Sequence, residues 1–323
     1  MAAFFNTMEQ KKNIILFHGD FDGIISALFI IKHYSLQKPL LYVTEPFTID
    51  KTYKKLLEIN IAERGMLYLV DVAPNNKNMK MTIDFYNQIS LQYPSVIMFD
   101  HHNGWEQVNF EKNCRVMVDK NAPSCAGFLF KTFEFSKCGF DSNEAEKLKR
   151  LADDADIIDS GGADGLSPDG ELIYKALKAD LKNENLRIEM LEYLLNTLQG
   201  HKNLKTYEKF SGLARDYEKI LEYSYGLIKN LKELRHGICF LNVGSAPCDI
   251  TSIMRKCYEK YKIVIIEYTA AGGQFYVIGT SEPQISLLEI LKLKSGAKFR
   301  ATINKKNIDE VLKLFDEYFE GIK

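Results

Sequence analysis

The sequence predicts an α/β protein with a parallel, doubly wound sheet, joined by a long helical segment to a smaller α/β domain. Through the first part of the chain, short apolar runs alternate with helical stretches, which is the pattern of a parallel sheet with helices on its faces. Between residues 204 and 234, apolar positions recur at three- and four-residue spacing among charges, so one long helix or two are expected there. His236 and Gly237 interrupt this pattern, and a second alternation of apolar runs and helical stretches follows.

The expected strands of the larger sheet are short apolar runs, most of which end in polar residues. They cover residues 13–17, 41–47, 66–72, 95–102 and 114–120. The helices expected between and after them cover residues 24–34, 50–60, 77–92 and 144–160, and residues 171–235 are mainly helical in pattern. Because ligands bind beyond the carboxyl ends of the strands in open α/β sheets, the polar residues that end these runs are the first candidates for a site.

The remainder of the chain predicts a smaller α/β domain. Its expected elements are strands over 238–243 and 263–268, a hairpin over 270–280, a strand near 297–303, and helices near 249–260, 285–293 and 307–321. A chain of 323 residues is long enough for two domains of ordinary size. The predicted boundaries are 1–200 for the larger domain, 201–236 for the helical connection and 237–323 for the smaller domain.

Composition narrows the class of protein. The chain has 42 basic and 43 acidic residues, a net charge of −1, which argues against a broad surface that coats nucleic acid and leaves room for a short basic groove. None of the six cysteines forms a CxxC pair, so reduced thiols in a cytoplasmic protein are expected. Neither a membrane-spanning apolar run nor a signal peptide is recognised, so no membrane partner is expected.

The segment HGDFDG at residues 18–23 is the first candidate for metal chemistry. His18, Asp20 and Asp22 are crowded there, and two carboxylates at such range repel each other unless a cation neutralises them. Glycines 19 and 23 permit a tight turn. A solvated turn is the alternative interpretation, since Asp and Gly are common turn residues.

Two further candidates also follow apolar runs. Asp71 ends the run over 66–72, where a turn or a helix cap is the alternative. Asp100, His101 and His102 follow another run, and adjacent histidines are unusual in a chain with only six. Neutral imidazole binds transition metals and a neighbouring carboxylate fixes its tautomer, whereas an exposed polar loop is the alternative.

The segment LADDADIIDSGG at residues 151–162 contains four aspartates, at 153, 154, 156 and 159. A solvated acidic helix end would explain them. Because apolar residues are interleaved, at least one of these carboxylates is expected in the interior, where it needs a partner such as a metal ion.

Together these segments resemble, in order and spacing, the motifs of the DHH phosphoesterase superfamily, over most of the chain. HGDFDG resembles the first motif in the form found in RecJ-like exonucleases, VDVAP at 70–74 the second, and DHH at 100–102 the third. ADII at 155–158 resembles the fourth, so that Asp156 is the best match, with Asp154 next.

The end of the chain is similar to the DHHA1 substrate-binding domain of that superfamily, over residues 245–268 and 272–282. That domain carries a Gly-rich loop that grips substrate phosphate. The matching segment here, KSGAKFRATI at 294–303, has one Gly and no His. Lys298 and Arg300 are the residues expected to meet a phosphate there, with solvated strand residues as the alternative.

The resemblance implies a centre of two metal ions with Asp71 as the bridge. The implied ligands are His18, Asp20 and Asp71 for one ion, and Asp22, Asp71, His101 and Asp156 for the other. Asp100 would orient a neighbouring group, and His102 would face the scissile phosphate as a hydrogen-bond donor or general acid. Carboxylate and imidazole ligands without thiolate suit Mn²⁺, with Mg²⁺ and Co²⁺ as alternatives.

The activity implied is hydrolysis of a phosphoester in a short single-stranded oligonucleotide or a small nucleotide. One alternative is hydrolysis of a phosphoanhydride such as pyrophosphate or polyphosphate. Another is an inactive relative that binds nucleotide. A homodimer is also expected.

Overall fold

The computed structural model describes residues 11–45, 48–60, 63–74, 78–110, 113–135, 141–201, 203–270, 272–293, 300–304 and 308–321. Contacts within the chain divide it into two units, Met1–Ala214 and Arg215–Lys323. The long helix expected before residue 234 is α8 (Leu204–Leu227), which runs through this division. The domain boundaries at 200 and 236 remain predictions.

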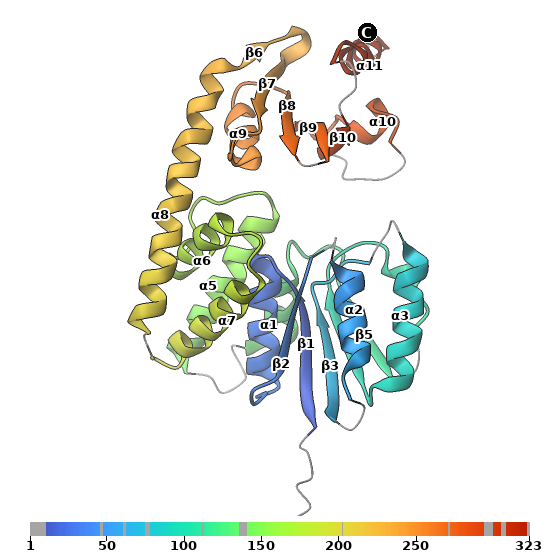
Figure 1. The fold of residues 1–323 in the computed structure, drawn as a ribbon, viewed down its shortest axis with the longest axis vertical. Helices are drawn as coiled ribbons and strands as arrows, with labels where there is room; N and C mark the ends of the chain where they lie inside the picture. Colours follow the sequence, from blue (N-terminus) through green and yellow to red (C-terminus); the bar gives the residue numbers. More distant parts are fainter. Residues whose placement is uncertain are drawn as a thin grey trace, which may run out of the picture. The chain divides into compact units, whose positions relative to one another are not determined.

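The first unit is built on a five-stranded parallel sheet, as the sequence predicts (Figure 1). In spatial order its strands are β2 (Leu40–Thr44), β1 (Lys12–His18), β3 (Arg64–Val70), β4 (Val96–Asp100) and β5 (Cys114–Val118). The chain crosses from β2 back to β3 beyond β1, so the direction of winding changes at β1. Sites in open α/β sheets form at such a change, beyond the carboxyl ends of the strands.

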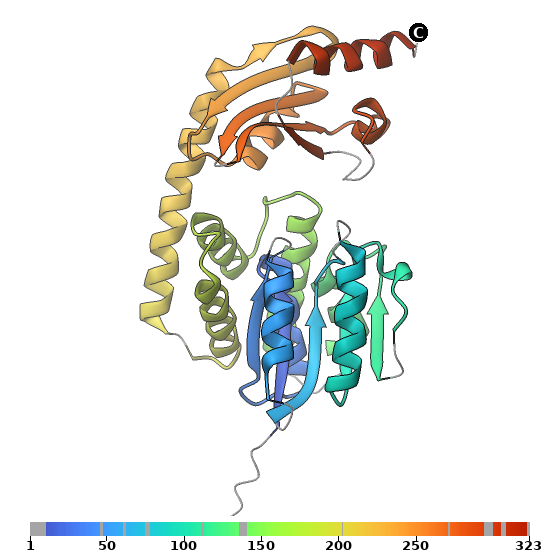
Figure 2. The same cartoon turned by 45° about the vertical axis from the view of Figure 1, so that its right-hand side comes forward.

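Helices cover both faces of this sheet. They are α1 (Phe21–His33), α2 (Ile49–Glu58), α3 (Met79–Gln92), α4 (Cys125–Thr132), α5 (Ser142–Asp159), α6 (Pro168–Ala179) and α7 (Glu184–Leu198). Figure 2 shows α2 and α3 side by side against one face. Tyr53 of α2 and Phe85 of α3 stack on each other and belong to one buried apolar cluster with Leu67 and Leu69 of β3. Helix α1 is apolar on all sides and is buried from Phe21 to Ile31, because α4, α5 and α7 also pack around it.

The second unit contains a mixed sheet with helices on both faces. Its strands are, in spatial order, β10 (Arg300–Asn304), β9 (Gly273–Thr280), β8 (Ile263–Ala270), β7 (Ile238–Gly244) and β6 (Lys232–Glu233). Only β7 and β8 pair in parallel among these strands. Its helices are α9 (Ile250–Cys257), α10 (Leu287–Ile290) and α11 (Ile308–Gly321).

Two predicted elements of the second unit differ in the structure. The expected hairpin over 270–280 is a single strand, β9, whose partner is β8. Strand β8 continues to Ala270, which pairs with Gly273, so the turn lies at the start of the segment instead of within it. The helix expected over 285–293 is reduced to the single turn of α10.

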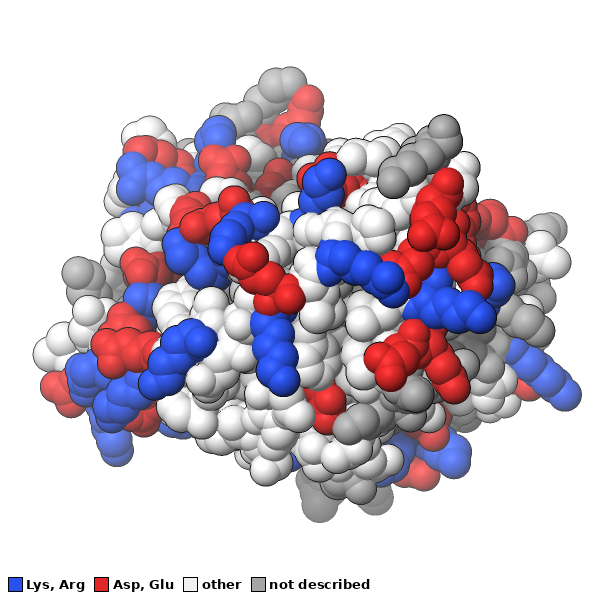
Figure 3. Space-filling model, turned by 90° about the horizontal axis from the view of Figure 1, so that it is seen from above, with Lys and Arg blue, Asp and Glu red and all other residues white. Residues whose placement is uncertain are grey.

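The described surface mixes charges of both signs. Figure 3 shows Lys and Arg side chains interspersed with Asp and Glu over the face that it draws, without a continuous basic area. Among the described residues, no helix has the length and apolarity that crossing a membrane requires.

Candidate metal centre

Three neighbouring strands of the first unit end side by side, and each end carries a predicted site residue. In the parallel register, Val70 of β3 lies between Phe17 of β1 and Phe99 of β4. The residues that follow these three are His18, Asp71 and Asp100. Asp71 has a φ of 55°, a left-handed conformation that costs energy for a residue with a side chain and is often found at functional sites.

The first motif turns tightly from β1 into α1. Asp20 caps the helix, since its Oδ1 accepts the Gly23 N–H at 2.9 Å, while its Oδ2 lies 2.8 Å from His18 Nδ1. A Cβ at Gly23 would come within 2.1 Å of the His18 carbonyl oxygen, so the turn requires glycine. The segment thus forms a tight turn, and the same turn brings the side chains of His18 and Asp20 together.

Asp22 lies on the first turn of α1 and is fully buried. Its two oxygens accept the N–H groups of Cys125 and Ala126, both at 2.7 Å, at the N-terminus of α4. The Ser26 hydroxyl adds a further contact, donating to Asp22 Oδ1 at 3.3 Å. Asp22 is thus fixed in place by a helix N-terminus, which favours negative charge.

The third motif orients its second histidine through Asp100. Asp100 Oδ1 lies 2.7 Å from His102 Nδ1 and accepts the backbone N–H groups of His101 and His102. Its Oδ2 accepts the indole N–H of the buried Trp105 at 2.6 Å. Asp100 therefore fixes the position of the His102 ring through Nδ1.

Side chains from these strand ends converge with the end of α5 on groups of candidate metal ligands. The groups are His18, Asp20 and Asp71; Asp22, His101 and Asp159; and Asp71, Asp100, His101 and His102. Asp71 Oδ2 lies 3.7 Å from His18 Nδ1, whereas its Oδ1 lies 3.4 Å from His101 Nε2. The two oxygens of one carboxylate therefore face two different groups.

The buried atoms of this cluster are suited to a divalent cation. Asp71 Oδ1 and His101 Nε2 are buried and make no hydrogen bond. Unpaired polar atoms in the interior are costly, and a shared metal ion would satisfy both. Carboxylate and imidazole are ligands of Mn²⁺ and related ions. Burial raises the pKa of the nearby Cys125 thiol well above its usual range, which disfavours a thiolate among the candidate ligands.

Electrostatic crowding also marks this cluster. Burial and then the charges of Asp71, Asp159 and Asp20 raise the pKa of Asp22 well above its usual range. Burial, followed by the charges of Asp20 and Asp71, raises the pKa of Asp159 to about 7. A cation would relieve this repulsion, because it stabilises the ionised carboxylates that burial disfavours.

The pKa values of the histidines are raised as well, which in their case favours the charged form. Burial alone would lower the pKa of His101, but the nearby carboxylates of Asp71 and Asp159 raise it to about 9. Burial likewise opposes the charged form of His18, and the neighbouring carboxylate of Asp20 outweighs it and raises the His18 pKa well above its usual range.

The last aspartate of the acidic segment, Asp159, joins the cluster. Its Oδ2 lies 3.5 Å from His101 Nε2. Asp156, the fourth-motif ligand predicted from the sequence, instead accepts the Ser124 hydroxyl at 2.5 Å. The alternative Asp154 accepts the backbone N–H of Ser167 at 2.8 Å before α6. The structure thus brings neither Asp156 nor Asp154 into a group of candidate ligands.

A sequence signal for Asp159 does exist. Asp156 and Asp159 are three residues apart on one face of α5, and Asp159 is the last residue of that helix, before Ser160 and two glycines. Only the position of the helix against the sheet decides which of the two reaches the strand ends. Glu45 is another residue that the sequence did not indicate, with Oε2 at 3.5 Å from His18 Nε2.

The predicted phosphate contacts lie in the second unit. Arg300 begins β10, is exposed, and donates from Nη1 to Thr251 Oγ1 at 3.0 Å. Lys298 lies outside the described residues.

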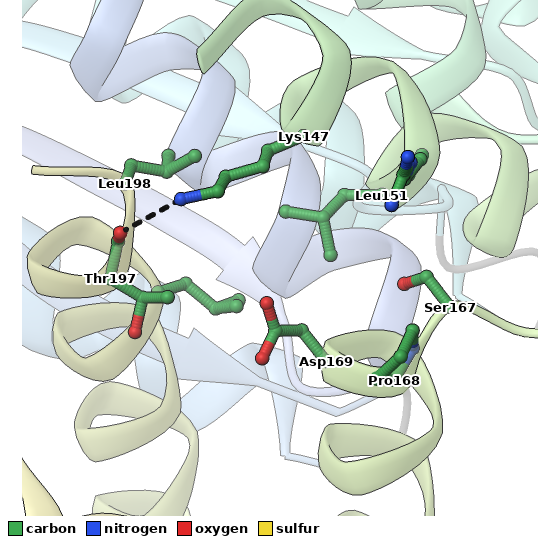
Figure 4. A pocket seen from close by; sticks show the side chains of 9 residues that line it. Lys147, Leu151, Ser167, Pro168, Asp169, Thr197 and Leu198 are labelled. Carbon is green, nitrogen blue, oxygen red and sulfur yellow. Dashed lines mark hydrogen bonds between the residues drawn. The ribbon is translucent and has the colours of Figure 1, made fainter. Parts of the chain in front are cut away.

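A separate cavity of about 150 Å³ lies between α5, α6 and α7 (Figure 4). Lys147 points across it and donates to the Thr197 carbonyl oxygen at 3.5 Å, and Asp169 faces the same space. None of the candidate metal ligands lines this cavity. The group of candidate metal ligands is therefore recognised by its converging side chains and not by this cavity.

This architecture, with Asp and His at successive ends of a five-stranded parallel sheet and a smaller mixed sheet after it, is also found in solved structures of RecJ and of a pGpG-specific phosphodiesterase. RecJ from Thermus thermophilus, solved in complex with Mn²⁺, matches with a TM-score of 0.61 and 14% identity, over 95% of this chain and 52% of that one. The structure therefore confirms the resemblance at the level of fold.

Two other solved structures match nearly their whole length. The pGpG-specific phosphodiesterase PggH from Vibrio cholerae has a TM-score of 0.58 and 15% identity, over 96% of this chain and 99% of that one. An exopolyphosphatase-related protein from Bacteroides fragilis has a TM-score of 0.57 and 13% identity, over 97% and 92%. No protein-family model and no curated protein matches the sequence. Identities this low establish the fold alone, so activity has to be argued from the site.

Proposed function

We propose that this protein is a metal-dependent phosphoesterase that binds two divalent cations, Mn²⁺ by preference, and hydrolyses a phosphoester in a short single-stranded oligonucleotide or small nucleotide. The observation that carries the proposal is the pair of buried, unpaired atoms, Asp71 Oδ1 and His101 Nε2, within a crowd of carboxylates at the strand ends.

The ligand assignment follows from the two faces of Asp71. One ion would be held by His18, Asp20 and Asp71, and the other by Asp22, Asp71, His101 and Asp159. Bridging is supported because Asp71 turns one oxygen toward His18 and the other toward His101. Asp159 replaces Asp156 in this assignment, since Asp159 lies beside His101 whereas Asp156 accepts a hydrogen bond from Ser124.

The chain's own residues divide the chemical work. When bound, the two cations supply a nucleophilic water near neutral pH and stabilise the charge that develops on phosphorus oxygens. Trp105 holds Asp100, and Asp100 holds Nδ1 of His102. With that nitrogen engaged, His102 meets substrate through Nε2 and donates a proton to the departing oxygen. Its side chain is 37% exposed, which leaves room for this contact.

The substrate class rests on three supports. Solved structures with this fold include a pGpG-specific phosphodiesterase and exonuclease RecJ. The net charge of −1 and the interspersed charges of Figure 3 favour a short nucleic-acid substrate over a long one. We also propose Lys298 and Arg300 as contacts to its phosphate, a cytoplasmic location, and a homodimer that size-exclusion chromatography with light scattering would detect.

A substrate panel tests the function directly. The full chain is assayed on linear dinucleotides such as pGpG, tri- to pentanucleotides, pAp and cyclic dinucleotides, without added metal and with Mn²⁺, Mg²⁺ or Co²⁺. We expect Mn²⁺-dependent release of mononucleotide from at least one linear substrate. Absence of turnover on every substrate, with the wild type and Asp71→Asn indistinguishable, would overturn the proposal.

A second candidate is a phosphoanhydride hydrolase. The observation that favours it is the fold match to an exopolyphosphatase-related protein over almost the whole chain. Phosphate release from pyrophosphate or polyphosphate that exceeds nucleotide release would select this candidate. An inactive nucleotide-binding relative is disfavoured because each of the two proposed ligand sets consists entirely of Asp and His residues. Tight nucleotide binding without turnover in Mn²⁺ would favour it.

A further inference from the structure

The turn between His18 and Asp20 is held from behind by a buried arginine of α7. Arg187 is 2% exposed, and its Nε donates to the carbonyl oxygen of Gly19 at 3.0 Å across 168 residues of sequence. Its Nη1 donates to the Asn183 carbonyl oxygen at 2.7 Å, and its Nη2 donates to the Leu181 carbonyl oxygen. The guanidinium therefore ties the start of α7 to the peptide between two candidate ligands.

The same guanidinium also contacts a carboxylate that faces the metal cluster. Arg187 Nη2 lies 3.3 Å from Glu45 Oε1, and the other oxygen of Glu45 lies 3.5 Å from His18 Nε2. His18 Nδ1 is directed the other way, toward Asp20 at 2.8 Å. The Nε2 atom of His18 thus faces the Glu45 carboxylate, whereas its Nδ1 atom faces the candidate metal ligands.

The glycine in this turn makes the arrangement possible. A Cβ at Gly19 would lie 2.4 Å from Glu45 Oε1 and 3.2 Å from Arg187 Nε. Any side chain at this position would displace the carboxylate, so the backbone approaches this ion pair as closely as sterics permit. Neither Glu45 nor Arg187 belongs to a group of candidate ligands.

We infer that Glu45 and Arg187 are positioning residues of the metal centre, an inference that rests on the proposed function. Glu45 accepts the Nε2 proton of His18, which fixes the tautomer whose Nδ1 lone pair faces the metal. Arg187 holds Glu45 in place and neutralises its charge. Metal-ligating histidines commonly donate their other N–H to a carboxylate, and losing such a partner costs about 10–100-fold in metal affinity.

Glu45→Gln tests the inference while it preserves the shape of the side chain. The dissociation constant of Mn²⁺ is measured on the full chain from the electron paramagnetic resonance signal of free Mn²⁺, with thermal unfolding recorded in chelator. We expect affinity for one ion to fall about tenfold or more, with the melting temperature in chelator little changed. Saturating Mn²⁺ should restore phosphodiester turnover to Glu45→Gln, because a positioning residue touches neither substrate nor metal.

Matched variants separate the possible explanations. Glu189→Gln removes an exposed carboxylate that pairs with Lys209 in the same unit and should leave Mn²⁺ affinity unchanged. Arg187→Lys keeps the charge but cannot serve Glu45 and the backbone carbonyls together, so it should weaken Mn²⁺ binding as Glu45→Gln does, and the double variant should lose less than the sum.

The outcomes distinguish this inference from the proposed function. Wild-type affinity in Glu45→Gln would overturn the inference and leave the metal centre standing. Failure of the wild type itself to bind Mn²⁺ would overturn both. If Arg187→Lys does not fold, Glu45→Gln alone decides.

Discussion

The two units of the chain treat charge differently. In the first unit, Asp22, Asp71 and Asp100 are almost completely buried around the ends of three strands. In the second unit, typical charges are exposed and pair at the surface, as Lys256 does with Glu259. Exposed pairs contribute about 0–1 kcal/mol to folding, whereas a buried carboxylate costs several kcal/mol unless it is well paired.

This contrast favours the first unit as the location of the proposed chemistry. A carboxylate cluster that costs folding free energy persists where function requires it, and in this chain it lies in the first unit. The second unit resembles an ordinary sheet domain in its described residues, with two apolar cores and exposed polar strand ends. Variants of the carboxylate cluster in the first unit should therefore change metal binding and turnover, whereas variants of Arg300 in the second unit should change substrate affinity.

The largest effect is expected from Asp71→Asn. Because Asp71 would bridge both ions, turnover should fall about a thousandfold or more, since metal ions supply several kcal/mol to the transition state and about 1.4 kcal/mol is tenfold. The measurement is kcat on the best dinucleotide at saturating Mn²⁺. Asp153→Asn, which removes an exposed carboxylate paired with Lys149, is the control and should retain activity. Equal activity in the two variants would contradict the proposed centre.

The next largest effect should show whether Asp159 or Asp156 is the fourth ligand of the second ion. Asp159→Asn should weaken Mn²⁺ binding about 10–100-fold, whereas Asp156→Asn should leave it within about threefold and lower stability by about 1 kcal/mol through its bond to Ser124. Calorimetric titration with Mn²⁺ and thermal unfolding in chelator measure the two quantities. The reverse result, with metal affinity lost in Asp156→Asn alone, would restore the assignment made from the motif.

The pH dependence of metal binding is a third test. Burial and neighbouring carboxylates raise the pKa of Asp22 and raise that of Asp159 to about 7, and the carboxylates of Asp71 and Asp159 raise the pKa of His101 to about 9, so these groups bind protons more tightly than usual. Metal must displace these protons, so Mn²⁺ affinity should rise with pH, up to about tenfold per unit for each proton released. Between pH 5 and 7, Asp159→Asn should lower the slope of log affinity against pH by up to one proton. An unchanged slope would show that Asp159 does not titrate with the metal.

Linkage gives the sign of a related stability effect. A carboxyl whose pKa is raised in the folded state binds more protons when folded than when unfolded, so its contribution to stability is present at low pH and is lost as pH rises through about 7. In chelator, Asp159→Asn should thus raise the melting temperature more at pH 8 than at pH 5. In saturating Mn²⁺ the wild type should instead have the higher melting temperature of the two proteins, because it gains the bound ion.

The sequence predicted the parallel sheet and the convergence of the polar residues that follow its strands, because strand ends in a parallel sheet meet at one edge whatever the loops between them do. It did not predict Asp159, since adjacent turns of α5 present Asp156 and Asp159 alike and only tertiary packing selects one. Glu45 and Arg187 were missed for a different reason. They lie 142 residues apart, and an isolated Glu or Arg has no local pattern that marks it.

The smallest effect is expected in the second unit, from Arg300→Ala. Its guanidinium is exposed, and a solvated contact to a phosphate contributes about 1 kcal/mol, so KM for a dinucleotide should rise about fivefold with kcat and Mn²⁺ affinity unchanged. Lys232→Ala, an exposed cation of the sheet's opposite edge strand, is the matched control and should leave KM unchanged. Salt distinguishes charge from shape, because the fivefold difference should shrink as ionic strength increases. A fall in kcat at saturating substrate would instead make Arg300 part of the catalytic machinery. It would contradict the assignment of catalysis to the first unit and of substrate binding to the second.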